Sequence, residues 1–517
     1  MSSPQDGWRR LDRRTVLVTA LVMAGVAAGA GLPIALGLAG AMPLWQAFGR
    51  VLAGALLLIA AGTGADYVRW RRTRYRIGPE RAELHTGLLL VQRRSLARER
   101  IRSVDLTANP LLRVLGLVKV RIGTGEHTAG GESTVELDPV SRAEGERLRR
   151  ELLARAADPS GTHREGTLAA LDPSWIRYAP VSFVAPLLGG AAVGGVMQVS
   201  EWFGAQGKVI DWVGDRFRDT PVVWMLVVLV VAAGVAGVVG ALGLWIEMWW
   251  NYRLEREPGG TLRVRRGLFT ARSISMEERR LRGVELVEPL GVRMFGAARV
   301  DAVATGLVKD DDDKHADLTV LLPAAPRAMA DEVSAQVLRE TVTPTSAARL
   351  TGHPRAARTR RLRWALAASL PPVLVLAVLG ARVTSVLLYL AAACAAVAVP
   401  IAVILALDAY RNLGHGISGA YLVARSGTVR RATVALQRSG VIGWTLKQSV
   451  FQRRAGVLTL TATTAAGAGA YSVYDAAEGE GLAFASEAVP GLLEPFLIRE
   501  ERTTGCGAAD DGATIPV

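Results

Sequence analysis

The chain has 517 residues, of which 50% are hydrophobic, and its mean hydropathy is +0.25. A soluble protein with 21% charged residues is rarely this apolar, so the apolar residues must be concentrated in particular segments. The net charge of +14 comes almost entirely from arginine. Because the sequence has no interleaved aromatic pattern of the kind that single-strand binding uses, a nucleic-acid partner is not expected.

Six segments are apolar and long enough to cross a bilayer, which requires about 20 residues. They form three pairs: residues 15–38 with 47–65, residues 178–199 with 221–246, and residues 364–381 with 383–407. Only Arg382 and its neighbours separate the last pair, which predicts a tight helical hairpin. We therefore expect six transmembrane helices in three hairpins, with Arg50 as the one ionisable residue inside them.

Arginines flank the first and third hairpins on one side of the membrane. They are Arg9, Arg10, Arg13 and Arg14 before the first hairpin, Arg69, Arg71, Arg72 and Arg74 after it, and Arg358, Arg360, Arg361, Arg363 and Arg411 around the third. The positive-inside rule places this side in the cytoplasm, and the middle hairpin follows by parity. We expect a multi-pass protein of the cell (plasma) membrane with both termini in the cytoplasm.

The first apolar segment has a second interpretation. Arg13 and Arg14 precede it and Ala28-Gly29-Ala30 follows, which is similar to a cleaved export signal. The apolar run continues past Ala30, and this favours an uncleaved span. The later segments keep the same topology in either case.

Each hairpin is followed by a segment in which the same signals come in the same order, so the chain contains three repeats. The signals are Gly87, residues 98–104 and 110–117 in the first repeat, Gly267, residues 278–284 and 289–296 in the second, and Gly427, residues 436–438 and 451–456 in the third. The glycines predict tight β-hairpins that need positive φ.

Alternating apolar runs at residues 118–123, 298–305 and 456–464 predict strands. Amphipathic helices are expected to close the first two repeats, at residues 139–156 and 326–341. The fold class is thus α+β, with a small β-sandwich or open barrel after each hairpin. The expected boundaries are 15–66, 175–247 and 363–408 for the hairpins, 67–157, 248–342 and 409–502 for the β-rich domains, and 503–517 for a flexible tail.

These repeats resemble the bacterial pleckstrin-homology-like membrane-flanked domain family, and in particular its three-copy, YdbT-like members. The first repeat carries the family signature at residues 100–104, with Arg102 where glutamine is common, and at 112–113 and 116–117. The second repeat matches less closely. The third is degenerate and retains mainly Gln437, Gln452, Arg453 and Arg454. The resemblance implies a pleckstrin-homology (PH)-like fold and little about activity, although some relatives are associated with tolerance of membrane-active peptides.

Clustered arginines beside a span face an anionic leaflet, where each contributes about 1 kcal/mol of attraction. Residues 67–121 contain fourteen cations and four anions, and residues 409–474 contain no acidic residue. The candidate lipid-facing residues are Arg69, Arg71, Arg72, Arg74, Arg93, Arg94, Arg453 and Arg454. The alternative is that the arginines near the span only fix the topology, and that Arg453 and Arg454 are a solvated strand end.

No catalytic, cofactor-binding or metal site is predicted. The six histidines are scattered singly, and the two cysteines suggest no disulfide framework. Asp310, Asp311, Asp312 and Asp313 form an acidic run that lacks the ligand spacing of a calcium loop, so a solvated loop tip is favoured.

The leading hypothesis is a non-enzymatic membrane scaffold whose domains bind anionic lipids of the inner leaflet, a protein partner or further copies of the chain, with a role in envelope stress or tolerance of membrane-active peptides. One alternative is a transporter or exporter component, for which prolines in the spans are the only signal. The other is a membrane-bound enzyme, although no GxxxxGK[ST], GxSxG or HExxH motif is present.

Overall fold

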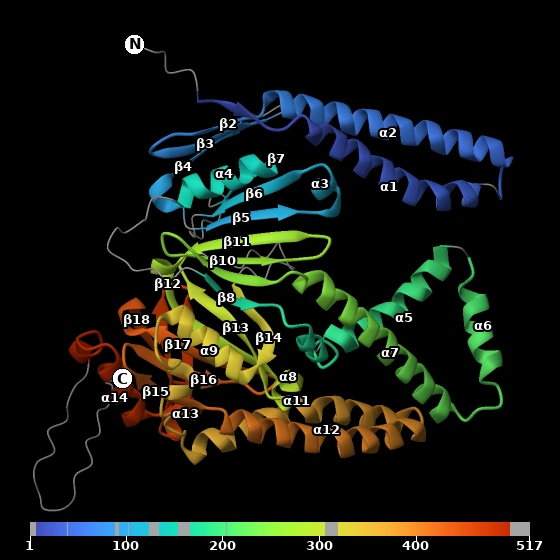
Figure 1. The fold of residues 1–517 in the computed structure, drawn as a ribbon. Helices are drawn as coiled ribbons and strands as arrows, with labels where there is room; N and C mark the ends of the chain where they lie inside the picture. The colour runs from blue at the N-terminus through green and yellow to red at the C-terminus, as the bar shows by residue number, and fades with distance from the viewer. Residues whose placement is uncertain are drawn as a thin grey trace, which may run out of the picture. The chain divides into compact units, whose positions relative to one another are not determined.

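The computed structural model describes residues 7–38, 40–87, 92–101, 103–123, 134–153, 166–182, 184–202, 204–305 and 319–496. The chain divides into two compact units, Met1–Glu278 and Arg279–Val517, and Figure 1 shows their elements. Three features singled out above lie outside the described residues: the acidic run from Asp310 to Asp313, Arg102 of the signature, and the tail at 503–517.

Five helices in the described part of the chain are long and apolar enough to cross a membrane. They are α1 (Arg14–Leu38), α2 (Leu44–Arg72), α7 (Val222–Trp249), α11 (Arg355–Arg382) and α12 (Ser385–Arg411). The segment expected to form one span at 178–199 is not a single continuous helix. Its first residue, Tyr178, ends a 3-10 helix, η3 (Pro173–Tyr178), and Pro180, which has no N–H to donate, separates η3 from α5 (Val184–Trp202). α5 has 19 residues and is not among the five helices that are long and apolar enough to cross a membrane.

The apolar helices pack in pairs, α1 with α2, α5 with α7, and α11 with α12. Small residues bring α5 and α7 together, because a Cβ atom added at Gly237 would collide with the backbone oxygen of Ala185, and one added at Gly189 with the backbone oxygen of Ala233. The chain between α5 and α7 forms an additional helix, α6 (Gln206–Arg216), which the sequence did not predict.

Four of the apolar helices extend beyond their expected ends and therefore contain carboxylates. Arg50 is the one ionisable residue that was expected inside the predicted segments, and the carboxylates lie beyond their ends: Asp66 in α2, Glu201 in α5, Glu247 in α7 and Asp408 in α12. Glu247 accepts hydrogen bonds from the backbone N–H groups of Phe269 and Thr270, both at 2.9 Å. Asp408 accepts one at 2.7 Å from the Thr428 hydroxyl. Glu247 and Asp408 thus tie α7 and α12 to a β-hairpin of the following repeat.

The strands of the three repeats follow one plan. The first repeat has β2 (Arg74–Ile77), β3 (Arg81–Thr86), β4 (Gln92–Ala97), β5 (Ser103–Ala108), β6 (Leu117–Gly123) and β7 (Thr134–Ser141). The second repeat has β9 (Arg253–Glu257), β10 (Thr261–Arg266), β11 (Ala271–Glu277), β12 (Leu281–Pro289), β13 (Ala297–Ala304) and β14 (Val320–Pro326). The third repeat has β15 (Gly414–Ser418), β16 (Tyr421–Ser426), β17 (Arg430–Gln437), β18 (Val441–Lys447), β19 (Val457–Thr464) and β20 (Ala470–Ala477).

Between its third and fourth strands each repeat has a one-turn 3-10 helix: η1 (Arg98–Arg100), η4 (Glu278–Arg280) and η5 (Arg438–Gly440). A short helix follows the fourth strand: α3 (Pro110–Val114), α8 (Leu290–Met294) and α13 (Val450–Arg454). The last strand leads into a closing helix: α4 (Arg142–Leu153), α9 (Arg327–Leu338) and α14 (Glu478–Ala488). The third repeat thus keeps every element of the other two, and its expected degeneracy does not extend to its fold.

Strands from different repeats share sheets. One sheet has the order β1-β2-β3-β4, where β1 is Arg9–Arg10, and another has β7-β6-β5-β11-β10-β9-β8, where β8 is Gly166–Ala170. In the second unit the orders are β14-β13-β12-β17-β16-β15 and β18-β19-β20. All pairs are antiparallel. The last three strands of one repeat are therefore hydrogen-bonded to the first three of the next.

The core of the first repeat lies between its two sheets and is closed by α4. Tyr75, Leu84 and Leu96 from β2, β3 and β4 pack in one buried cluster with Val120 of β6 and Leu148 of α4. A second cluster joins β16, β17, β18 and β19 to α14 in the third repeat. The tight hairpins are confirmed at Gly267 and Gly427, with φ of 112° and 97°.

A candidate lipid-facing surface

The predicted arginines at the end of α2 point in different directions. The guanidinium of Arg69 lies 2.6 Å from the carboxylate of Asp66, which also accepts a hydrogen bond of 2.7 Å from the Thr19 hydroxyl of α1. Asp66 is buried. Arg69 therefore helps to join α1 to α2, whereas Arg71 and Arg72 lie exposed on the last turn of the helix.

A row of basic side chains crosses the first sheet. Residues paired across antiparallel strands project from the same face. Arg10 of β1 pairs with Arg74 of β2, Arg74 pairs with His85 of β3, and His85 pairs with Arg93 of β4. Arg10, Arg74 and Arg93 are exposed, and His85 is half-buried. We call Arg10, Arg74, His85 and Arg93 the basic row.

The other face of this sheet is the core face. Arg94 pairs with buried Leu84 and so belongs to that face, in contrast to its neighbour Arg93. Arg9 pairs with buried Tyr75, and its guanidinium lies 3.1 Å from the carboxylate of Glu144 on α4. The strand alternation thus assigns adjacent arginines to opposite faces.

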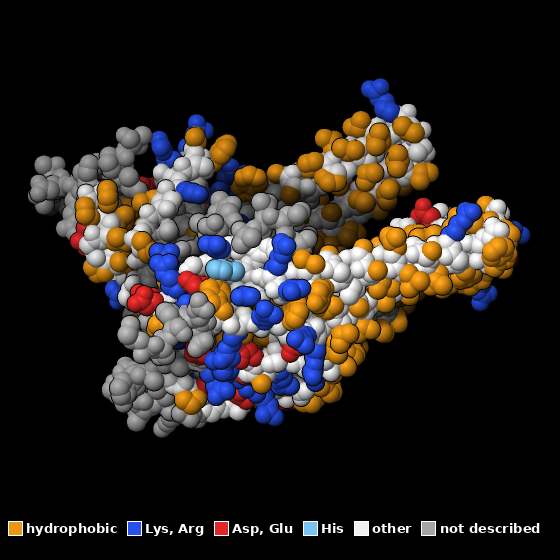
Figure 2. Space-filling model, turned by 90° about the horizontal axis from the view of Figure 1, so that it is seen from above, with side chains coloured by type: hydrophobic (Ala, Val, Ile, Leu, Met, Phe, Trp, Pro, Cys, Tyr) orange, Lys and Arg blue, Asp and Glu red, His pale blue; other side chains and the backbone are white. Residues whose placement is uncertain are grey.

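An open pocket of about 710 Å³ joins the helix end to the basic row. It is lined by Tyr67, Val68, Arg71, Arg72, Arg74, His85, Thr86 and Gly87. The indole ring of Trp8 packs against His85, with ring centroids 4.3 Å apart. Figure 2 shows Lys and Arg side chains gathered over this part of the surface, beside the apolar helices. Arginines in such a place can bind phosphate oxygens through two N–H groups at once.

Three contributors to this surface were missed from the sequence. Arg10 was counted only as a topology signal, His85 was treated as an isolated histidine, and Trp8 was not considered. The alternation of β3 could have placed His85 on the outer face, but the pairing of β1 with β2 joins residues distant in sequence and leaves no local signal.

In the second unit, Arg453 and Arg454 are exposed on α13. They therefore lie on a short helix and not at a strand end. Because residues 409–474 contain no acidic residue, their cations are expected to lack acidic partners, and this is wrong for Arg430 and Arg431. Arg430 lies 2.8 Å from Glu285, and Arg431 lies 2.6 Å from Glu288. Both acids belong to β12 of the second repeat, which a count restricted to the third repeat does not include.

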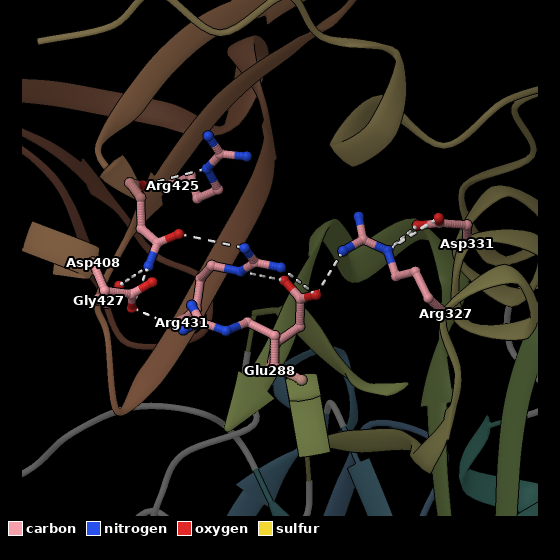
Figure 3. A network of polar contacts seen from close by, with 9 residues as sticks. Glu288, Arg327, Asp331, Asp408, Arg425, Gly427 and Arg431 are labelled. Carbon is pink, nitrogen blue, oxygen red and sulfur yellow. Dashed lines mark hydrogen bonds and ion pairs between the residues drawn. The ribbon is translucent and has the colours of Figure 1, made fainter. Parts of the chain in front are cut away.

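Figure 3 shows how Glu288 links two repeats. This buried carboxylate binds Arg431 of β17 and also Arg327, at 2.8 Å. Arg327 is held in turn by Asp331, at 3.0 Å. Breaking a buried pair leaves an uncompensated charge, which is costly, so these arginines are committed to the shared sheet.

Comparisons with known proteins agree with this architecture. The sequence profile of the family described as Bacterial PH domain matches residues 21–156 and 366–489, which contain the first and third repeats with most of their hairpins. The UPF0699 transmembrane protein YdbT of Bacillus subtilis (strain 168) is 22% identical over 297 residues, covering 53% of this chain and 58% of that protein. The chain thus matches little more than half the length of this relative. No solved structure matches.

Proposed function

Because the chain belongs to the bacterial PH domain family, we propose that it is a non-enzymatic scaffold of the plasma membrane whose first repeat binds anionic lipid headgroups of the inner leaflet. The chain is a multi-pass membrane protein with bacterial PH domains, similar to YdbT. The observation that carries the proposal is the pocket that joins Arg71 and Arg72, at the end of α2, to Arg74 and His85 of the basic row.

The position of these cations favours a lipid ligand. Arg71 and Arg72 end a helix that is apolar enough to cross the bilayer, so their guanidinium groups lie at the depth of the headgroups if α2 spans the membrane. The tyrosine at position 67 lies one turn earlier on the same helix, where aromatic residues typically meet the interface. A headgroup phosphate would complement the positive charge.

The proposed topology has six spans in three hairpins, with all three repeats in the cytoplasm. α5 is the sixth span in this account, because its close packing on α7 through Gly189 and Gly237 is typical of transmembrane helix pairs. The amphipathic helix α6 then lies on the outer side. The carboxylates of α2, α7 and α12 bind neighbouring residues, which favours an anchoring role for them over an ion pathway.

The test is a binding measurement with short-chain phosphatidylglycerol on the purified full chain, with phosphatidylcholine as the neutral lipid. Arg71→Gln/Arg74→Gln removes two cations from the pocket. At about 1 kcal/mol for each arginine, affinity for the anionic lipid should fall about 30-fold. Added salt should weaken binding by the unaltered protein, since the attraction is electrostatic.

The matched control is Arg142→Gln/Arg150→Gln, which removes the same charge from exposed positions on α4 of the same repeat, away from the pocket. It should retain nearly full affinity. An equal loss in both variants would show that net charge alone drives binding, and no loss in either would exclude the pocket as a headgroup site.

A further inference from the structure

The shared sheets contain two seams that join strands of the same kind. β5 pairs with β11, and β12 pairs with β17. In both seams the strand that follows the 3-10 helix in one repeat pairs with the strand that precedes the 3-10 helix in the next repeat. The repeats are therefore joined by backbone hydrogen bonds through one recurring interface.

The two seams also have the same register. In the first, Ser103 pairs with Met276, and in the second, Gly283 pairs with Leu436. Ser103 and Gly283 are each the third residue after their 3-10 helix, and Met276 and Leu436 are each the second residue before theirs. A register slip would move every side chain to the other face, so its repetition indicates a defined interface.

At each end of the series of repeats, the strand that corresponds to this interface has no partner on its outer edge among the described residues. Within the described ranges β4 pairs with β3 alone, and β18 pairs with β19 alone. Their counterparts in the seams contain long buried stretches, whereas one residue is buried in β4, Leu96, and one in β18, Val441. An unpaired strand edge is a template for pairing with another chain.

The short helix beside the second seam also contacts the next repeat. The backbone N–H of Leu290, at the start of α8, donates to the carbonyl of Val429 in the next repeat at 2.8 Å. Arg293 of α8 lies 2.8 Å from Asp408 of the next hairpin. In the third repeat Val450 and Arg453 occupy these two positions, and both are exposed. Val450 is 66% exposed and its neighbour Phe451 is 70% exposed, although both are large and apolar.

We propose that β18 of one chain pairs with β4 of a second copy of the same chain and continues the seam between molecules. The register of the internal seams places Gly443 opposite Leu96 and Lys447 opposite Gln92 of the second copy. The two surfaces differ, so the interface is heterologous and the chains form a closed ring or an open row in the membrane.

The charges on the two edges give this association a recognisable salt dependence. β4 contains Arg93 and Arg94, β18 contains Lys447, and neither strand contains an acidic residue. Like charges across the seam oppose pairing, and added salt screens them. Association should therefore tighten as ionic strength rises, the opposite of the response expected for lipid binding.

The register can be tested by disulfide formation in membranes, using full-length chains in which Cys394 and Cys506 are replaced by alanine. One tagged chain carries Gln92→Cys and a second, differently tagged chain carries Lys447→Cys. Both positions are exposed. Directly paired residues have Cα atoms within the range that a disulfide requires. The matched control pairs Ser95→Cys with Lys447→Cys, which shifts the partner by about 10 Å along the strand.

The expected result is a product containing both tags that forms on oxidation with Gln92→Cys and is reduced several-fold with Ser95→Cys. The mass of the purified protein in detergent should exceed that of one 54.9 kDa chain. Equal yields in the two combinations, a product containing another protein in place of the second chain, or a purely monomeric mass with no product would each overturn the proposal. Unchanged thermal melting of each variant verifies that it is folded.

Discussion

Arg69 and Arg71 are separated by one residue and have different tasks. Arg69 points along α2 to buried Asp66, whereas Arg71 lines the pocket beside the basic row. The helical period decides this, because residues three apart share a helix face and residues two apart do not. A cluster of cations in a sequence therefore identifies a charged region, but the contact made by each side chain depends on its element.

A second residue-scale feature is the buried pair of His353 and His415 in the second unit. Their Nε2 and Nδ1 atoms are 3.0 Å apart, and the ring of Phe484 packs against His415. Burial lowers the pKa of His415 to about 4, and it also lowers the pKa of His353. Both rings are therefore neutral at pH 7, and one nitrogen can donate to the other.

This pair predicts a loss of stability in mild acid. Below pH 6.5 His415 of the unfolded chain takes up a proton that the folded chain accepts only near pH 4, and His353 is shifted in the same direction, so the free energy of unfolding falls across this window. Thermal melting temperature in detergent, measured between pH 7 and pH 4, should decline. His353→Asn/His415→Asn should flatten the decline. An identical slope in the two proteins would contradict the assignment.

At the scale of elements, the sequence predicted what depends on neighbours along the chain. Alternation located strands such as β6, β13 and β19, and glycine located the hairpins at Gly267 and Gly427. The end of α2 was less predictable, because its last turn is stabilised by arginines near the helix C-terminus and by a carboxylate bound to another helix. The helix α14 was also missed, since its sequence has little amphipathic contrast and its burial depends on β19 and β20.

The pairing of α5 with α7 gives a prediction at this scale. Gly237→Val places a branched side chain against the backbone of α5 and should cost about 1–3 kcal/mol, lowering the melting temperature in detergent. Gly234→Val on the same helix meets no atom within 4 Å and serves as the control. If both variants melt alike, the two helices do not pack as described.

At the scale of the whole molecule, the three repeats are connected by shared sheets as well as by the chain. The number and order of repeats could be predicted from the sequence, but the sharing could not. The edge hydrogen bonds of β5 with β11 use backbone atoms that every sequence possesses, and acids such as Glu285 and Glu288 neutralise arginines more than one hundred residues away. The same dependence on distant partners explains why the basic row was only partly anticipated.

The location of all three repeats on the cytoplasmic side of the membrane can be tested by labelling single cysteines in intact cells with a membrane-impermeant maleimide. Exposed positions suit this test: Ser95, Phe269 and Lys447 in the three repeats, and Asp211 in α6. With Cys394 and Cys506 replaced, we predict that Asp211→Cys is labelled from outside, and that Ser95→Cys, Phe269→Cys and Lys447→Cys react only after the membrane is opened. Labelling of any of these three from outside would place that repeat on the outer side of the membrane and rule out the proposed topology.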